Sequence, residues 1–388
     1  LSITSGTENV IIGNSAGDAL TDADRNVAIG RNTLTRDTLG SKTVAVGYGT
    51  LQTQNLTTAT DTYNVAVGYN AGALVTTGTS NTLIGGIAGD ALTDADRNIA
   101  IGYATLSSDT LGSRSVAIGS GALNTQNLTT ATDTYNVAIG DSAGLSVTTG
   151  VHNTLIGGGA GDALTNSSHN VALGYNALGT DTLGAKSTAL GRSALGSQNF
   201  TTATDVFNTA VGYDAGNAVT TGAFNTLIGG LAGDALTDGY DNVAVGKGAL
   251  TTEDRGAKNT AIGHEALATQ NAGTGNTFNT AVGASAGAAV TTGRYNTFSG
   301  ANSALAMTEG QRNTALGYGA LQTDTKGARN VGLGFNALGT QNFTTATDSY
   351  NIGIGYDAGG AITTGVENTL IGSLAGDALT DADFNIAI

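Results

Sequence analysis

The stretch Asn26-Val27-Ala28-Ile29-Gly30 decides the fold, because close variants of it recur along the whole chain. The unit is asparagine, a β-branched residue, a small residue, an aliphatic residue and a closing glycine. The closing glycines are spaced by 17, 17, 21 and 17 residues, and this group of four then repeats. Such a period is typical of a repeat protein. We therefore predict one continuous repeat shaft over residues 1–388, with about 21 coils in 72-residue super-repeats, as a segment of a longer fibre.

The residues just before each closing glycine predict a short β-strand. The first of them is Val, Ile or Thr in every unit, and the third is Val, Ile or Leu except at Ser299. Because side chains alternate along a strand, we expect these two positions to share a buried face. The residue between them is small or apolar and never charged, so we expect sister copies of the chain to cover it. The pattern predicts an all-β parallel β-solenoid of 17- and 21-residue coils that associates with itself.

The asparagine and the glycine of each unit are predicted to have structural roles. Stacked coils place the asparagine amides in a ladder in which each bonds the next. The glycine supplies a backbone angle or a close approach that a Cβ atom forbids. We expect these roles at Asn26, Gly30, Asn64, Gly68, Asn98, Gly102, Asn136, Gly140, Asn225 and Gly229.

Two further local features are expected in the coils. The alanine three places after most closing glycines, such as Ala71 and Ala122, suggests a second short strand. The third coil of each super-repeat is longer and contains Thr-rich sequence, as in residues 54–61, which we expect to bulge from the outer surface.

The composition excludes several classes of protein. The chain has 60 glycines but no Pro, so it lacks the composition of collagen, and it is rich in Val, Ile and Thr, unlike disordered chains. A net charge of −15 disfavours nucleic-acid binding. No apolar run is long enough to suggest membrane insertion of this segment. With no Cys, the chain has neither disulfides nor thiolate metal sites.

No constellation of catalytic residues is recognisable. The nucleophile-elbow pattern G-x-S-x-G occurs at residues 13–17, 140–144 and 283–287, but the equivalent serine position holds Ile87 in another unit. The three histidines are scattered and solitary. We predict that the protein is not an enzyme and has no catalytic or cofactor-binding residues.

Acidic residues recur in one turn of the super-repeat. Carboxylates suit Ca²⁺, a hard cation with oxygen ligands, but another copy of the turn replaces two of its three aspartates by Asn166 and Ser168. Solvated turn residues and weak Ca²⁺ ligands both remain open interpretations. The candidates are Asp18, Asp22, Asp24, Asp90, Asp94 and Asp96.

Basic residues and aromatic residues recur five places before the closing glycines. The basic residues, such as Arg312 and Arg329, each have an aspartate nearby in sequence in several coils, namely Asp37, Asp109, Asp181 or Asp324. We interpret them as members of surface ion pairs. The alternative is a binding site for an anion or a glycan. The aromatic ones are expected to cover the base of the long loop or to form a sugar platform. They are Tyr63, Tyr135, Phe207, Phe278 and Tyr350.

Two segments carry a resemblance to known families. Ser115-Val116-Ala117-Ile118-Gly119 resembles the head repeat of trimeric autotransporter adhesins of the YadA-like type. Asn313-Thr314-Ala315-Leu316-Gly317-Tyr318-Gly319-Ala320-Leu321 is similar to repeats of phage tail fibre proteins. The resemblance implies a left-handed β-roll in which three chains wind around a common axis, and a role in adhesion or receptor-reaching display. The adhesin repeat is shorter than the spacing found here, so its packing details do not transfer.

These observations favour a structural function outside the cell. We expect the shaft of a trimeric phage tail fibre or surface adhesin, a rigid spacer located extracellularly or on a virion. The alternative is a receptor- or glycan-binding adhesin head that contacts a host-surface glycan or protein. An ice-binding solenoid is a minor alternative, because its surface needs a regular Thr array and the Thr-Thr pairs lie mainly in the third and fourth coils.

Overall fold

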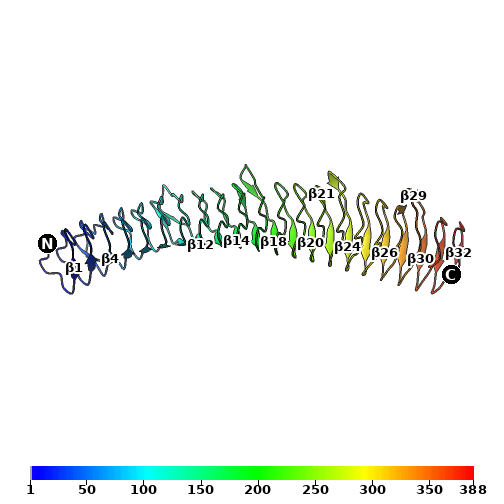
Figure 1. Cartoon of the computed structure of the whole chain (residues 1–388), viewed down its shortest axis with the longest axis horizontal. Helices are drawn as coiled ribbons and strands as arrows, with labels where there is room; N and C mark the ends of the chain where they lie inside the picture. The colour runs from blue at the N-terminus through cyan, green and yellow to red at the C-terminus, as the bar shows by residue number, and fades with distance from the viewer. Residues whose placement is uncertain (1) are drawn as a thin grey trace. The chain divides into compact units, whose positions relative to one another are not determined.

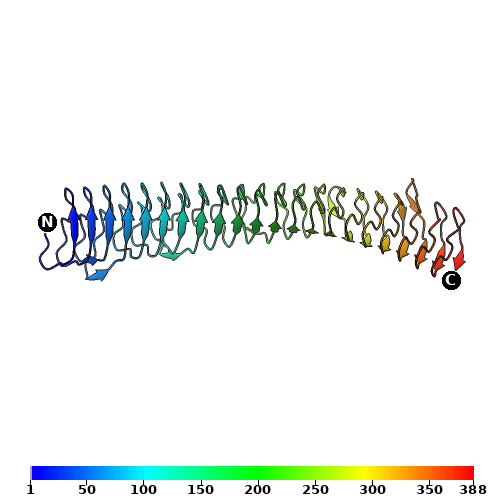
Figure 2. The same cartoon turned by 60° about the horizontal axis from the view of Figure 1, so that its bottom comes forward.

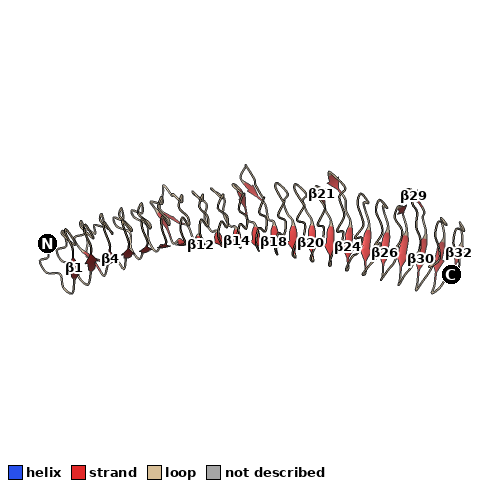
Figure 3. Cartoon of the chain, viewed as in Figure 1, coloured by secondary structure: helices blue, strands red, loops and turns tan. Residues whose placement is uncertain are grey.

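The computed structural model describes residues 2–388, which form two compact units. The first unit comprises the residues up to 187 together with 199–205, and the second comprises residues 188–198 together with 206–388. Each unit is a parallel β-solenoid, and no helix occurs in the described part of the chain (Figure 3). The predicted all-β solenoid class is therefore confirmed.

The first unit contributes one three-residue strand per coil to its main sheet, and these strands lie side by side (Figure 1). They are β1 (Val10–Ile12), β2 (Val27–Ile29), β4 (Val44–Val46), β6 (Val65–Val67), β7 (Thr82–Ile84), β8 (Ile99–Ile101), β10 (Val116–Ile118), β12 (Val137–Ile139), β13 (Thr154–Ile156) and β14 (Val171–Leu173). Two-residue strands pair only where a long coil occurs. They are β3 (Gly40–Ser41) with β5 (Thr60–Asp61), β9 (Gly112–Ser113) with β11 (Thr132–Asp133), and β15 (Gly184–Ala185) with β17 (Thr204–Asp205).

The second unit repeats this arrangement. Its main-sheet strands are β16 (Thr188–Leu190), β18 (Thr209–Val211), β19 (Thr226–Ile228), β20 (Val243–Val245), β22 (Thr260–Ile262), β24 (Thr280–Val282), β25 (Thr297–Ser299), β26 (Thr314–Leu316), β28 (Val331–Leu333), β30 (Ile352–Ile354), β31 (Thr369–Ile371) and β32 (Ile386–Ala387). The short pairs are β21 (Gly256–Ala257) with β23 (Gly275–Asn276), and β27 (Gly327–Ala328) with β29 (Thr347–Asp348). Figure 2 shows the main strands of each unit side by side.

The register follows the sequence repeat without slippage. Val10 of β1 pairs with Val27 of β2, and Val44 of β4 pairs with Val65 of β6 across a long coil. The additional residues of the long coil are therefore accommodated outside the main sheet. Equivalent residues of successive coils therefore form columns along each unit.

The two faces of the main sheet are the reverse of the sequence prediction. Ala28, Ala45 and Ala138, the middle residues of their strands, are fully buried inside the coil of the same chain. The flanking residues, expected to be buried, point outward and are only partly covered, as in β12. No sister chain is needed to bury the alanines, because each coil folds back and covers its own strand.

The coil interior is filled by complementary volumes. Most strands have Ala in the middle. Where the residue four places after the closing glycine is leucine, such as Leu34 or Leu51, its side chain is buried and fills the space. In the coil with Leu83 in the middle, the positions that face it are Gly72 and Gly89, where a Cβ atom would lie 2.6 Å and 2.8 Å from the Leu83 side chain. Because the interior is closely packed, a large side chain in the middle of the strand and another at the facing positions cannot both fit.

The predicted second strand is wrong. The residues after each closing glycine form turns in which leucines adopt left-handed angles, with φ of 52° at Leu34 and 48° at Leu51. Ala71 and Ala122 lie in these turns and are buried in the interior. A strand there is impossible because the chain must reverse around the narrow core within a few residues.

The asparagines form the ladder that closes each coil. Asn26 Oδ1 accepts a hydrogen bond from the backbone N–H of Thr43 at 2.9 Å, and its Nδ2 donates to the carbonyl of Gly40 at 2.9 Å. Each amide therefore binds the backbone of the next coil at two points, the residue that precedes the strand and the carbonyl group three residues before that residue. The same contacts to the next coil are made by Asn64, Asn98, Asn136 and Asn225.

The closing glycines adopt a backbone angle that other residues avoid. Gly30 has φ of +133°, and a Cβ atom there would collide with the carbonyl oxygen of Gly47 in the next coil. The unusual backbone angle and the close approach of another backbone segment, which were expected as alternatives, therefore both occur at this glycine. The angles are similar at Gly68, Gly102, Gly140 and Gly229.

Candidate functional site

The main sheet of each unit exposes an uncharged, largely aliphatic surface, which we call the outer face. It consists of the first and third residues of every main-sheet strand, for example Val137 and Ile139 of β12. Leu173 is 45% exposed and Ile228 is 38% exposed, although neither is near a chain end. Within residues 2–388 no strand places a charged residue on this face. Extended apolar surfaces of this kind are uncommon on monomeric proteins and mark interaction sites.

In the second unit one column of the outer face is rich in threonine. The first strand residue is Thr in seven of the eight coils from β16 to β26, with Val243 as the exception. The neighbouring column remains Val, Ile or Leu apart from Ser299. This threonine column was not anticipated, because these residues were expected to lie on a buried face.

Stacked rings and cations border the outer face. They occur five places before and one place after the closing glycines, where rings of successive coils lie face to face, as Tyr48 and Tyr69 do at 5.4 Å between centroids. Lys42 lies 5.1 Å from the ring centroid of Tyr63, a cation–π contact. The aromatic residues before each fourth asparagine thus pack against neighbouring coils. The stacked rings direct their faces toward the neighbouring coils.

The basic residues pair with carboxylates of the long loops. Lys42 Nζ lies 2.6 Å from Asp61 Oδ2, and this hydrogen bond lowers the pKa of the Asp61 carboxyl. The equivalent pairs are Arg114–Asp133, Lys186–Asp205 and Arg329–Asp348. The prediction that the partners are Asp37, Asp109, Asp181 and Asp324 is wrong, because those four carboxylates are fully buried.

The buried carboxylates belong to a polar network inside each long coil. Asp109 Oδ2 accepts a hydrogen bond from Gln126 Nε2 at 2.6 Å, and Gln126 Oε1 accepts one from Asn136 Nδ2 at 2.9 Å. The backbone N–H groups of Gly112 and Leu128 donate to Asp109 Oδ1. These contacts satisfy a charged group that burial would otherwise destabilise. The role of this network is to hold the long loop, and it is closed to ligands.

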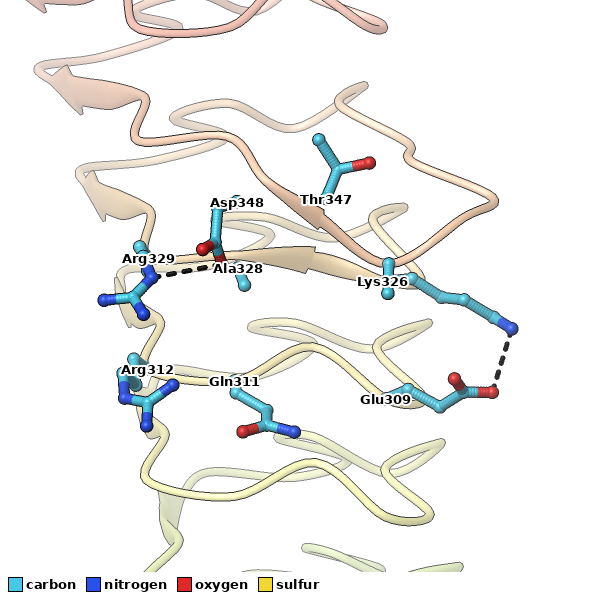
Figure 4. Close-up of a pocket in the computed structure, with 9 residues that line it drawn as sticks. Glu309, Gln311, Arg312, Lys326, Ala328, Arg329, Thr347 and Asp348 are labelled. Atoms are coloured by element: carbon cyan, nitrogen blue, oxygen red, sulfur yellow. Dashed lines mark ion pairs between the residues drawn. The ribbon is translucent and has the colours of Figure 1, made fainter.

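A recess lies beneath the long loop of the second unit that contains β29 (Figure 4). Its volume is about 410 Å³, and its polar lining includes Gln311, Arg312, Lys326, Arg329, Thr347 and Asp348. Arg312 and Arg329 come from successive coils, and Asp348 comes from the loop above them. The long loop thus creates a hollow on the surface of the second unit.

The acidic turns are occupied by hydrogen bonds between coils. Asp24 Oδ1 accepts from the backbone N–H and the hydroxyl of Thr7, and the first of these contacts lowers the pKa of Asp24. Asp96 accepts equivalent bonds from Thr79, whereas burial raises the pKa of Asp90. Asp22 and Asp94 accept from Ser5 and Thr77 of the preceding coil, and Asp18 lies in the turn after Gly17. Across residues 2–388, no three acidic or histidine side chains converge on a metal position.

The serines of the nucleophile-elbow pattern lie in turns. Ser15, Ser142 and Ser285 have φ between 54° and 57°, and within the described residues no hydrogen bond joins their Oγ atoms to a histidine. Ser142 Oγ instead donates to Asp141. The pattern arises from the glycines that the turn requires.

No protein-family model matches the chain, and no curated protein matches it significantly. Among residues 2–388 the structure has no helix of the length and apolarity that a membrane span needs.

Proposed function

We propose that this chain is the shaft of an extracellular or virion-surface fibre, in which three parallel copies pack through their outer faces. The uncharged, exposed outer face of each unit is the observation that carries the proposal. The resemblance of the repeat to YadA-like heads and phage tail fibres supplies the number three and the location.

The composition of the outer face favours burial against protein. Its side chains are β-branched or aliphatic, and burial of apolar surface gives about 25 cal/mol per Å². The first unit alone contributes the flanking residues of ten strands, so the face far exceeds an incidental patch. Interfaces of obligate oligomers have this apolar character.

A second copy of the same chain is the partner that matches the face best. Columns along each unit repeat at the strand spacing of roughly 4.8 Å, so a parallel copy in register presents the same period. The net charge of −15 lies outside the face and does not oppose the contact. Such a shaft is rigid along its length, because every coil is held in place by its neighbours.

Replacing outer-face residues by charges tests this proposal. We expect light scattering of the purified wild-type chain to give a trimer. The variant Ile118→Lys/Ile139→Glu/Ile156→Lys should give a monomer with an unchanged β-type circular dichroism spectrum, because these side chains lie outside the coil. The alternating charges avoid repulsion between adjacent coils of one chain.

A matched control is Ile118→Thr/Ile139→Thr/Ile156→Thr, which introduces a residue that occurs naturally on the outer face elsewhere. It should remain trimeric. A wild-type chain that is monomeric at micromolar concentration, or a charged variant that remains trimeric, would contradict the proposal.

The threonine column of the second unit favours ice binding as a second candidate function. A flat row of hydroxyls and methyl groups at regular spacing is the surface that this activity needs. Measurement of thermal hysteresis on the wild-type chain decides this point. Freezing-point depression without trimer formation would favour this candidate over the shaft.

A further inference from the structure

We propose that the recess beneath the long loop containing β29 binds a carboxylate-bearing sugar. The inference goes beyond the shaft function and uses a different surface. The recess has a volume of about 410 Å³, which lies in the range of small-molecule sites in proteins.

The charge of the recess is opposite to that of the chain. Its lining has three cations, Arg312, Lys326 and Arg329, and two carboxylates, Glu309 and Asp348. The protein as a whole has 30 acidic and 15 basic residues. A local excess of positive charge on such a chain favours an anionic ligand.

Arg312 is the group without an acidic partner. Lys326 Nζ lies 2.9 Å from Glu309, and Arg329 Nε lies 3.0 Å from Asp348, as the dashed lines in Figure 4 mark. No carboxylate within residues 2–388 lies within 4.0 Å of the Arg312 guanidinium, which lies over the ring of Tyr295 at 5.5 Å. The ring contact fixes the position of the guanidinium and leaves its hydrogen-bond donors available.

The two guanidinium groups are suited to a carboxylate. Arg312 and Arg329 occupy equivalent positions of adjacent coils, so their backbones are one strand spacing apart, roughly 4.8 Å. Asp348 Oδ1 approaches the Arg329 guanidinium at Nε, 3.0 Å away. A carboxylate placed against both groups can receive bidentate hydrogen bonds.

The remaining lining suits sugar hydroxyls. The Gln311 amide lies between the arginines and the Lys326–Glu309 pair, and the loop above contributes Thr347 (Figure 4). Amides and hydroxyls both donate and accept, as a polyhydroxylated ligand requires. Ala328, which also lines the recess, has a small side chain. An acidic sugar satisfies the charged and the neutral polar groups together.

The hollow recurs in the first unit, but its cations differ. There it is lined by His169, Lys186, Thr204 and Asp205, and Lys186 is paired with Asp205 at 2.6 Å. The long loop therefore sets the shape and the two stacked residues set the ligand. The other pair of stacked arginines is Arg97 and Arg114, where Arg97 also lacks an ion pair among the described residues. We expect these two arginine pairs to bind and the histidine–lysine pair to bind more weakly.

Saturation-transfer NMR and calorimetry on the full chain test the inference, with sialyllactose, lactose and inorganic phosphate as probes. We expect sialyllactose to bind and lactose to bind at least tenfold more weakly. The double variant Arg97→Gln/Arg312→Gln should weaken sialyllactose binding at least tenfold, whereas Arg97→Lys/Arg312→Lys should retain part of it. Arg255→Gln, a change to an exposed arginine away from the recess, should have no effect.

Three results would overturn the inference: equal binding of lactose, equal binding of phosphate, or unchanged sialyllactose affinity in Arg97→Gln/Arg312→Gln. Circular dichroism melting of each variant excludes a loss caused by unfolding. The oligomeric mass of the same samples is measured separately, so failure of the shaft proposal and failure of this inference are distinguishable.

Discussion

Ala138 and Ile139 are adjacent residues of β12, yet they lie on opposite sides of the coil wall. Ala138 is fully buried within its own chain, whereas Ile139 points outward and is partly exposed. This relationship recurs in the main-sheet strands of both units. The coil interior therefore determines stability, and the outer face is available for association.

Ala138→Glu should unfold the coils around β12. The substitution places an ionised carboxylate in a closed interior without a partner, which is strongly destabilising. We expect a reduced β signal in circular dichroism and rapid proteolysis near residue 138. Ile139→Glu is the control and should retain the signal; equal behaviour of the two variants would contradict the assignment of the faces.

Gly85→Ala should destabilise the first unit by about 1–3 kcal/mol, because φ at Gly85 is +138° and a Cβ atom would collide with the Gly102 carbonyl. Gly86→Ala is a control in the adjacent residue. It has an ordinary φ, and its nearest neighbour would be a Tyr103 ring atom at 3.5 Å, so its effect should be small. Denaturant unfolding measures both. A similar loss for both variants would show that general loss of glycine flexibility, and not the local geometry, is responsible.

Leu155→Ala should cost about 2–5 kcal/mol of unfolding free energy, the usual range for a buried leucine. Leu155 is fully buried and is the side chain that faces Gly144 and Gly161, so the cavity has no neighbour that can fill it. Leu74→Ala removes a leucine that is 51% exposed and should cost roughly 0.5 kcal/mol or less. A small effect at Leu155 would mean that the core can collapse around the cavity.

The buried Asp324 should make stability depend on pH. Burial raises the pKa of this carboxyl above its unfolded value, so its stabilising contribution is complete below the unfolded pKa and is lost as pH rises through the folded pKa. Relative to Asp324→Asn, the wild type should therefore gain unfolding free energy as the pH is lowered from 7 to about 4.5. Thermal unfolding at both pH values measures this difference. A difference that stays constant, or that changes in the opposite direction, would contradict this account of the site.

The sequence was sufficient to predict the coils, their spacing and the parallel stacking, because a strict repeat of Asn and Gly leaves one register. It was not sufficient to assign the faces. In a three-residue strand with Ala between two aliphatic residues, either the Ala or the aliphatic pair can face inward, and the aliphatic pair was expected to form the core. The decisive signal lay elsewhere: Gly72 and Gly89 replace leucine at the positions that face Leu83. That volume exchange shows that the middle residue and the turn share one interior.

The buried polar network was missed for a related reason. Asp109 was interpreted as the partner in a surface ion pair, since aspartate is usually exposed, and no role was assigned to Gln126. Their recurrence at a fixed separation, with Asn136 ten residues further on, could have indicated a hydrogen-bonded group inside the long coil. The recess at Arg312 could not be predicted, since it depends on how far the long loop extends from the coil.

Cross-linking through a single cysteine tests the central claim about the outer face most directly, because the natural chain has no Cys. If three parallel copies meet through this face, Ile139→Cys places identical thiols near the common axis, within reach of a disulfide or a short bifunctional reagent. Mild oxidation should then convert most of the protein into a covalent dimer with twice the 38.2 kDa mass of the chain. Leu74→Cys, in an exposed turn away from the main sheet, should not cross-link. An Ile139→Cys variant that remains monomeric under these conditions, with its β structure intact, would contradict the account.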